Sequence, residues 1–211
     1  MDTRQRAIEI IKRLRAVYPN AKIALKFSNN WELLVATELS AQCTDKKVNE
    51  VTGTLFNKYR TVADYAHAGV AEFEQDIRPT GFFRNKTKNI IGAAQMVLTE
   101  FDGQVPRTMT EILRLPGVAR KTANIVLGNA YGVVDGIAVD THVLRLSRRL
   151  GLSDGKTPEM VERDLMALWP KDDWFGATYL VIEHGRAICT AKKPQCGSCV
   201  LNDICPSAFK V

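Results

Sequence analysis

The stretch "LPGVARKTANIV", residues 115–126, is the most informative part of the sequence for the fold. Apolar residues at helical spacing precede and follow a Pro-Gly-Val turn, so residues 108–115 and 119–131 are predicted to form a helical hairpin. Arg120 and Lys121 stand at the start of the second helix, where each cation costs roughly 0.3–1 kcal/mol. Free amides at a helix start bind anions, which would offset that cost. The stretch therefore predicts either an ordinary hairpin or an anion-binding one.

The rest of the chain shows the same helical spacing, and no strand is predicted. Thr108 with Glu111 fits a capping box. Thr157 is predicted to cap a helix whose first residue is Pro158. The fold class is therefore all-α. Besides the hairpin, helices are predicted over 3–17, 31–41, 45–59, 70–78, 86–101, 141–150, 158–168 and 173–187.

The charge of the chain favours a polyanionic partner. Lys and Arg number 29 against 23 Asp and Glu, which gives a net charge of +6 in 211 residues. The sequence contains no run of about 18 apolar residues and no apolar signal core near its start. We therefore expect a cytoplasmic protein with no membrane partner.

Four of the five cysteines crowd near the C-terminus with the spacing C-x6-C-x2-C-x5-C, at Cys189, Cys196, Cys199 and Cys205. In a reducing compartment such a cluster indicates a metal site rather than disulfides. Structural zinc usually uses two C-x2-C pairs, and only one is present, whereas four irregularly spaced thiolates also suit an iron–sulfur cluster. Cys43 stands apart and is interpreted as a structural thiol.

Five segments, in order along the chain, resemble those of the endonuclease III family, which consists of helix-hairpin-helix DNA glycosylases. They run from about residue 30 to residue 205 and are "ELSAQCTDKKVN", "GFFRNKTKNI", "LPGVARKTAN", "IAVDTHVLRLSRRLGL" and the cysteine-rich tail.

The resemblance implies a two-domain helix-hairpin-helix DNA glycosylase fold. A six-helix barrel would span 22–132 and include the hairpin at about 108–131. An iron–sulfur-cluster domain would combine 1–21 with 133–211, and DNA would lie in the cleft between the domains. The four clustered cysteines would hold a [4Fe-4S] cluster.

The resemblance also assigns the reaction. Lys121 matches the nucleophile, whose neutral amine would attack C1′ and form a Schiff base. A helix N-terminus, the adjacent Arg120 and burial in a cleft would all disfavour its ammonium form. Asp140 matches the catalytic carboxylate, which would stabilise positive charge on the sugar and take part in proton transfer. From the residues alone, Lys121 could be a solvated surface lysine and Asp140 a helix N-cap.

Further residues match the DNA contacts of the family. An extruded base leaves a gap, which Gln42 and Phe82 would fill, although a capping Gln and a buried Phe are the simpler readings. The family usually has Gly where this chain has Ala119, and a methyl group limits how closely a phosphate approaches. The predicted DNA-binding residues are Gln42, Phe82, Gly117, Ala119, Arg120, Lys192 and Lys193.

The function implied is that of a bifunctional DNA glycosylase and AP lyase of base excision repair. It would remove oxidised pyrimidines from double-stranded DNA and cleave 3′ of the abasic site by β-elimination. The competing hypothesis is a noncatalytic DNA-binding protein that keeps the hairpin and cluster as a scaffold. We expect a monomer, associated with the nucleoid if the source is prokaryotic.

Overall fold

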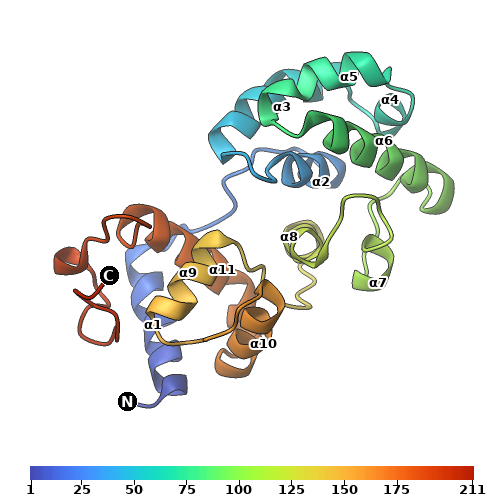
Figure 1. Cartoon of the computed structure of the whole chain (residues 1–211). Coiled ribbons are helices and arrows are strands. Elements are labelled where there is room, and N and C mark those ends of the chain that lie inside the picture. The colour runs from blue at the N-terminus through green and yellow to red at the C-terminus, as the bar shows by residue number, and fades with distance from the viewer. The chain divides into compact units, whose positions relative to one another are not determined.

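The computed structural model describes residues 1–211, and all of its regular structure is helical (Figure 1). The chain divides into two compact units. The central unit is residues 24–133, and the terminal unit joins residues 1–23 to residues 134–211. Each unit is described by itself below.

The central unit is organised around two pairings of helices. Helix α6 packs against α4 and α5, and α2 packs against α8 (Figure 1). The α-helices of this unit are α2 (Asn30–Leu39), α3 (Asp45–Lys58), α4 (Val62–Ala66), α5 (Val70–Ile77), α6 (Phe83–Glu100), α7 (Met109–Ile112) and α8 (Arg120–Tyr131), and η1 (Arg78–Thr80) is a 3-10 turn.

The core of the central unit contains an aromatic group beside a wholly buried helix. Every residue of α2 from Trp31 to Leu39 is buried, so this helix has no solvent face. The Tyr65 ring lies 5.4 Å from that of Trp31 and 5.8 Å from that of Phe73, both edge to face. Such pairs add roughly 0.5–1.5 kcal/mol each beyond the area they bury.

The terminal unit is built from both ends of the chain. Helix α1 (Thr3–Val17) packs against α10 (Pro158–Leu168) and α11 (Lys171–Ala187), and α11 also packs against α9 (Thr141–Arg149). The short 3-10 turn η2 (Cys196–Ser198) follows in the C-terminal segment.

Helix α1 is held in the terminal unit by packing and by one hydrogen bond to a buried ring. Ile10 and Leu14 are fully buried in the same core as Trp169. The Trp169 indole Nε1 donates to the Ala7 carbonyl at 3.1 Å. Residues more than 150 positions apart therefore share one core.

Several predicted boundaries are confirmed, and a few are wrong. Helices α1 and α10 begin and end as predicted, α8 begins one residue later than predicted, and Thr157 caps α10 with Pro158 in its first turn. The five-residue α4 was not predicted, because one helical turn is too short to show a periodic pattern. Helix α6 starts three residues earlier than predicted, and α7 covers only Met109–Ile112 of the predicted 108–115.

Candidate functional site

The predicted hairpin is formed by α7, a turn and α8. The Thr108 hydroxyl oxygen accepts from the Glu111 amide at 3.3 Å and so caps α7. The Glu111 carboxylate accepts from the Thr108 hydroxyl at 2.7 Å rather than from its backbone amide. The expected capping box is therefore only half formed.

Gly117 makes the turn of the hairpin, and no other residue fits there. Its φ of 84° lies in the left-handed region that side chains disfavour. A Cβ at this position would lie 2.7 Å from Glu38 Oε2 and 2.8 Å from the Asn89 Cβ. The turn thus rests directly on α2 and α6.

The start of α8 has no side-chain cap. Ala119 is the N-cap residue, with φ −93° and ψ 170°, so it stands outside the helix that it was predicted to begin. Its methyl group cannot accept the first amides of α8, and the first turn contains no acidic residue. A helix start without a side-chain cap is compatible with the anion-binding interpretation.

Lys121 is the second residue of α8 and its side chain is exposed. The expectation that burial in a cleft helps to activate it stays a prediction. Arg120 precedes it and is half-buried. The helix start and Arg120 are the features beside the amine.

Gln42 and Phe82 occupy two turns of the central unit, and both have a left-handed backbone, with φ of 53° and 49°. Non-glycine residues rarely adopt this conformation, and it costs about 1–3 kcal/mol. Both side chains are exposed, and 61% of Phe82 is accessible. The simpler readings, a buried Phe and a helix-capping Gln, are wrong. Strained left-handed residues often occur at functional sites, so this geometry is compatible with the predicted DNA contacts.

Asp140 is the N-cap residue of α9. Its Oδ1 accepts from the Val143 amide at 2.8 Å, and the side chain is half-buried. The capping interpretation is therefore correct. Capping uses one carboxylate oxygen, so it does not conflict with a chemical role for the other oxygen.

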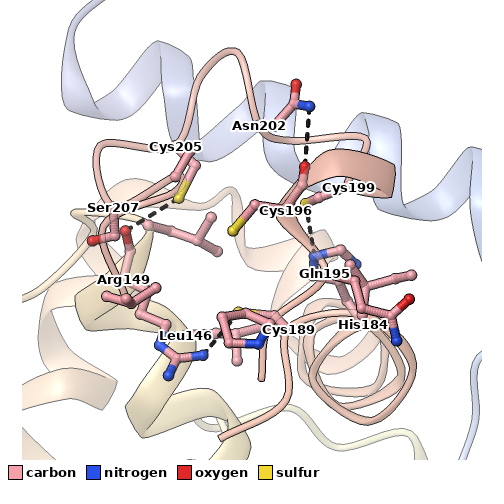
Figure 2. A pocket seen from close by; sticks show the side chains of 15 residues that line it. Leu146, Arg149, His184, Cys189, Gln195, Cys196, Cys199, Asn202, Cys205 and Ser207 are labelled. Atoms are coloured by element: carbon pink, nitrogen blue, oxygen red, sulfur yellow. Dashed lines mark hydrogen bonds between the residues drawn. The ribbon is translucent and has the colours of Figure 1, made fainter. Parts of the chain in front are cut away.

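The four clustered thiols line one pocket of the terminal unit (Figure 2). Leu146, Ile188, Pro194 and Ala208 give the pocket apolar walls. Burial raises the pKa of the Cys199 and Cys205 thiols. All four are half-buried and form no disulfide; they are Cys189, Cys196, Cys199 and Cys205.

This donor set fits an iron–sulfur cluster. No group of His, Cys, Asp or Glu side chains is arranged to hold a single metal ion. A four-iron cluster is wider than one ion and binds each thiolate through a different iron, so thiols spread around a pocket suit it. The buried thiols would be deprotonated by the bound metal.

His184 supports the pocket from α11 (Figure 2). Its Nε2 lies 3.4 Å from the Cys199 Sγ and its Nδ1 lies 3.4 Å from the Tyr18 hydroxyl. Burial lowers the pKa of His184 to about 4, so the ring is neutral at pH 7.

Arg149 was not predicted as a site residue, although it contacts both Cys189 and the loop that carries Lys192 and Lys193. Its Nη1 donates to the Cys189 Sγ at 3.3 Å and to the Thr190 carbonyl at 2.7 Å, and its Nη2 donates to the Ala191 carbonyl at 2.9 Å. Lys192 and Lys193 follow directly, with exposed side chains. The sequence "RLSRRLGL" offers three arginines and no signal that singles out this one.

The site residues are divided between the units. The central unit holds Gln42, Phe82 and the hairpin with Lys121, and the terminal unit holds Asp140, the four clustered cysteines and the two loop lysines. No helix is both long enough and apolar enough to cross a membrane.

Comparison with protein families gives two matches. Residues 35–171 match the HhH-GPD superfamily of base excision DNA repair proteins. Residues 189–205, which run from Cys189 to Cys205, match the iron–sulfur binding domain of endonuclease III.

Relatives match over nearly the whole chain. Endonuclease III of Synechocystis is 53% identical in sequence, and the match covers 97% of this chain and 94% of the relative. Endonuclease III of Escherichia coli K12 is 40% identical, and the match covers 97% of this chain and 96% of the relative. The solved structure of a trapped endonuclease III–DNA covalent intermediate is 44% identical, with a TM-score of 0.95 over 100% of this chain and 99% of its own. The chain therefore belongs to the endonuclease III family of HhH-GPD base excision DNA repair proteins.

Proposed function

We propose that this chain excises damaged bases from DNA as a DNA glycosylase and cleaves the resulting site as an AP lyase. The observation that carries the proposal is the exposed amine of Lys121 at the uncapped start of α8. A lyase needs an amine that can reach a sugar carbon, and a helix start without a side-chain cap is suited to bind the adjacent phosphate. Membership of the endonuclease III family supports both activities.

Lys121 is the proposed nucleophile. Its neutral Nζ attacks C1′ of the damaged nucleotide, and the base leaves with the electrons of the glycosidic bond and takes up a proton. After the nitrogen has lost one proton, its lone pair expels the ring oxygen O4′, which takes up a proton, and the sugar ring opens to a protonated Schiff base. Removal of a C2′ proton then expels the 3′ phosphate by β-elimination, and water releases the lysine.

Asp140 is the proposed carboxylate partner. While one oxygen caps α9, the other is available to stabilise positive charge that grows on the sugar as the base departs. It can also take up a proton released by the attacking amine.

Gln42 and Phe82 are proposed to enter the DNA stack. The amide of Gln42 can hydrogen-bond the base left without a partner, and the ring of Phe82 can separate neighbouring bases. Contacts to phosphate are proposed for Gly117, Ala119, Arg120, Lys192 and Lys193.

A [4Fe-4S] cluster is the cofactor of this chain, as the iron–sulfur family match supports. Cys189, Cys196, Cys199 and Cys205 are the proposed ligands. When bound, the cluster would fix the C-terminal segment as a scaffold. Arg149 would then hold the loop that presents Lys192 and Lys193.

The finer assignments are also proposals. Oxidised pyrimidines in double-stranded DNA are the proposed substrates, and the protein is proposed to act as a monomer. In a prokaryotic cell, its work on DNA would place it at the nucleoid.

Borohydride trapping on DNA that contains one abasic site tests the function. The reductant should fix the Schiff base as a covalent adduct with the parent protein. Lys121→Gln should abolish both the adduct and strand cleavage, while much of the DNA binding persists because phosphate contacts supply it. Lys26→Gln, at another exposed lysine, controls for the lost charge. A parent that binds DNA without forming an adduct would favour the noncatalytic alternative.

A further inference from the structure

Lys86 is a buried lysine to which the proposed reaction gives no task. It lies on α6 with only 5% of its surface accessible, and burial lowers its pKa. Its Nζ donates to the Leu39 carbonyl and to the Thr80 carbonyl, at 2.8 Å each. Neither partner is a carboxylate. Burying an amine without a counter-charge is unfavourable, so its position calls for an explanation.

The two acceptors lie beside the two strained turns. Leu39 ends α2, three residues before Gln42. Thr80 ends η1, two residues before Phe82. One amino group therefore joins the entrances of both turns, which lie about 40 residues apart in sequence.

Local hydrogen bonds close each turn by itself, from the Cys43 amide to the Ser40 carbonyl and from the Gly81 amide to the Arg78 carbonyl, whereas the Lys86 amine bonds to both segments. Carbonyls at the end of a helix lack partners within the helix, and Lys86 supplies one to each segment. Exposed side chains such as Phe82 do not anchor their own backbone. Left-handed non-glycine residues persist only where their surroundings fix them.

We propose that Lys86 is a positioning residue that holds the Gln42 turn and the Phe82 turn at a fixed separation, ready to enter the DNA gap together. It touches neither substrate nor reacting atoms and acts through these two residues. The inference rests on the proposed function and deepens it, since it explains how two fillers on separate segments stay in register.

Lys86→Met tests the inference through two reactions of one enzyme. Removing a damaged base requires extrusion of the base and filling of the gap, whereas a preformed abasic site has no base to extrude. The single-turnover rate of base removal should fall by about 10-fold or more, the scale of a misplaced positioning group. Cleavage at a preformed abasic site should fall much less, so the ratio of the two rates changes.

Two variants on the same helix separate positioning from loss of stability. Thr87→Val alters a neighbouring buried residue whose hydroxyl has no partner, and Ile90→Val trims the core one turn further on. Both should keep the parental ratio of rates, even where the melting temperature falls. If Lys86→Met does not fold, Lys86→Gln serves instead, because its shorter amide can keep at most one of the two bonds.

A double-mutant cycle tests the route of the effect. With Gln42 and Phe82 both changed to Ala, the further change Lys86→Met should slow base removal only slightly, because little remains to be positioned. An undiminished effect in that background, or a folded Lys86 variant with the parental ratio of rates, would overturn the inference alone. A parent protein with neither activity would overturn the proposed function and this inference with it.

Discussion

Ala119 shows how one methyl group can affect both stability and binding. An N-cap residue normally supplies a side-chain oxygen to the first amides of its helix, and glycine is preferred to alanine there. Ala119→Gly should therefore leave the melting temperature unchanged or raise it, in contrast to the cost expected for a glycine inside a helix.

The same substitution should tighten DNA binding. Without the methyl group a phosphate can approach the amides of α8 more closely, so binding to damaged and undamaged DNA should improve by similar factors. Titrations at several salt concentrations measure this. Weaker binding by the folded variant would mean that the methyl group contributes to the contact.

Glu38 is predicted to make stability depend on pH. Only 6% of this residue of α2 is accessible, its Oε1 has no hydrogen-bond partner, and burial raises its pKa from 4.5 to about 8. Between these values the folded chain holds a proton that the unfolded chain has lost, so the contribution of Glu38 to stability is fully present below pH 4.5 and is lost as the pH rises towards 8.

Urea unfolding of the parent and of Glu38→Gln between pH 6.5 and 8 checks this, because His184 titrates alike in both proteins and its contribution cancels in the comparison. The parent should lose stability relative to Glu38→Gln as the pH rises. Parallel curves for the two proteins would show that Glu38 ionises as freely in the folded state as in the unfolded state.

The features that sequence could not predict arise from contacts between distant residues. Glu38 occupies a position that reads as the polar side of a helix, yet α2 has no solvent side. Nothing in the sequence around Phe82 predicts its left-handed backbone. The nearby hydrogen bond from Lys86 to the Thr80 carbonyl could not be predicted either, because it exists only in the folded chain. Thr157 and Pro158, by contrast, act within one turn of their own helix, and their prediction was correct.

At the scale of elements, the loop at 190–193 depends on the end of α9. Arg149→Met removes the donors to Thr190 and Ala191, so the loop lysines should lose their fixed position. DNA affinity should fall, and the slope of its logarithm against that of salt concentration should decrease by about one to two, as expected for one or two lost phosphate contacts.

Arg148→Met is the matched control. This neighbour on α9 donates to the Gly155 and Lys156 carbonyls and forms no hydrogen bond with the loop at 190–193. It should keep the parental salt slope. The visible absorbance of the cluster, measured for both variants, separates loop motion from cluster loss, and an Arg149→Met protein with the parental slope would contradict the prediction.

At the scale of the whole molecule, α1 belongs to the unit that holds the cysteines. The Arg13 guanidinium on α1 donates to the Asp203 carboxylate at 2.6 Å and to the Val200 carbonyl at 3.0 Å, and both acceptors lie between Cys199 and Cys205 in the sequence. Deleting residues 1–17 should therefore release iron from the purified protein, which iron analysis measures. The central unit should keep its helices by circular dichroism. Full iron content in the truncated protein would show that α1 is dispensable for the site.

The composition of the terminal unit from both chain ends sets an order of events during synthesis. Residues 24–133 leave the ribosome as one continuous segment and can fold while translation proceeds. Helix α1 emerges first, but its core partners are made last, Trp169 among them. Helix α1 therefore lacks these packing partners until residues 134–211 have been synthesised. Insertion of iron and sulfide would then have to follow the synthesis of Cys205, and a ribosome that stalls before this residue would yield a central unit without the full set of clustered cysteines.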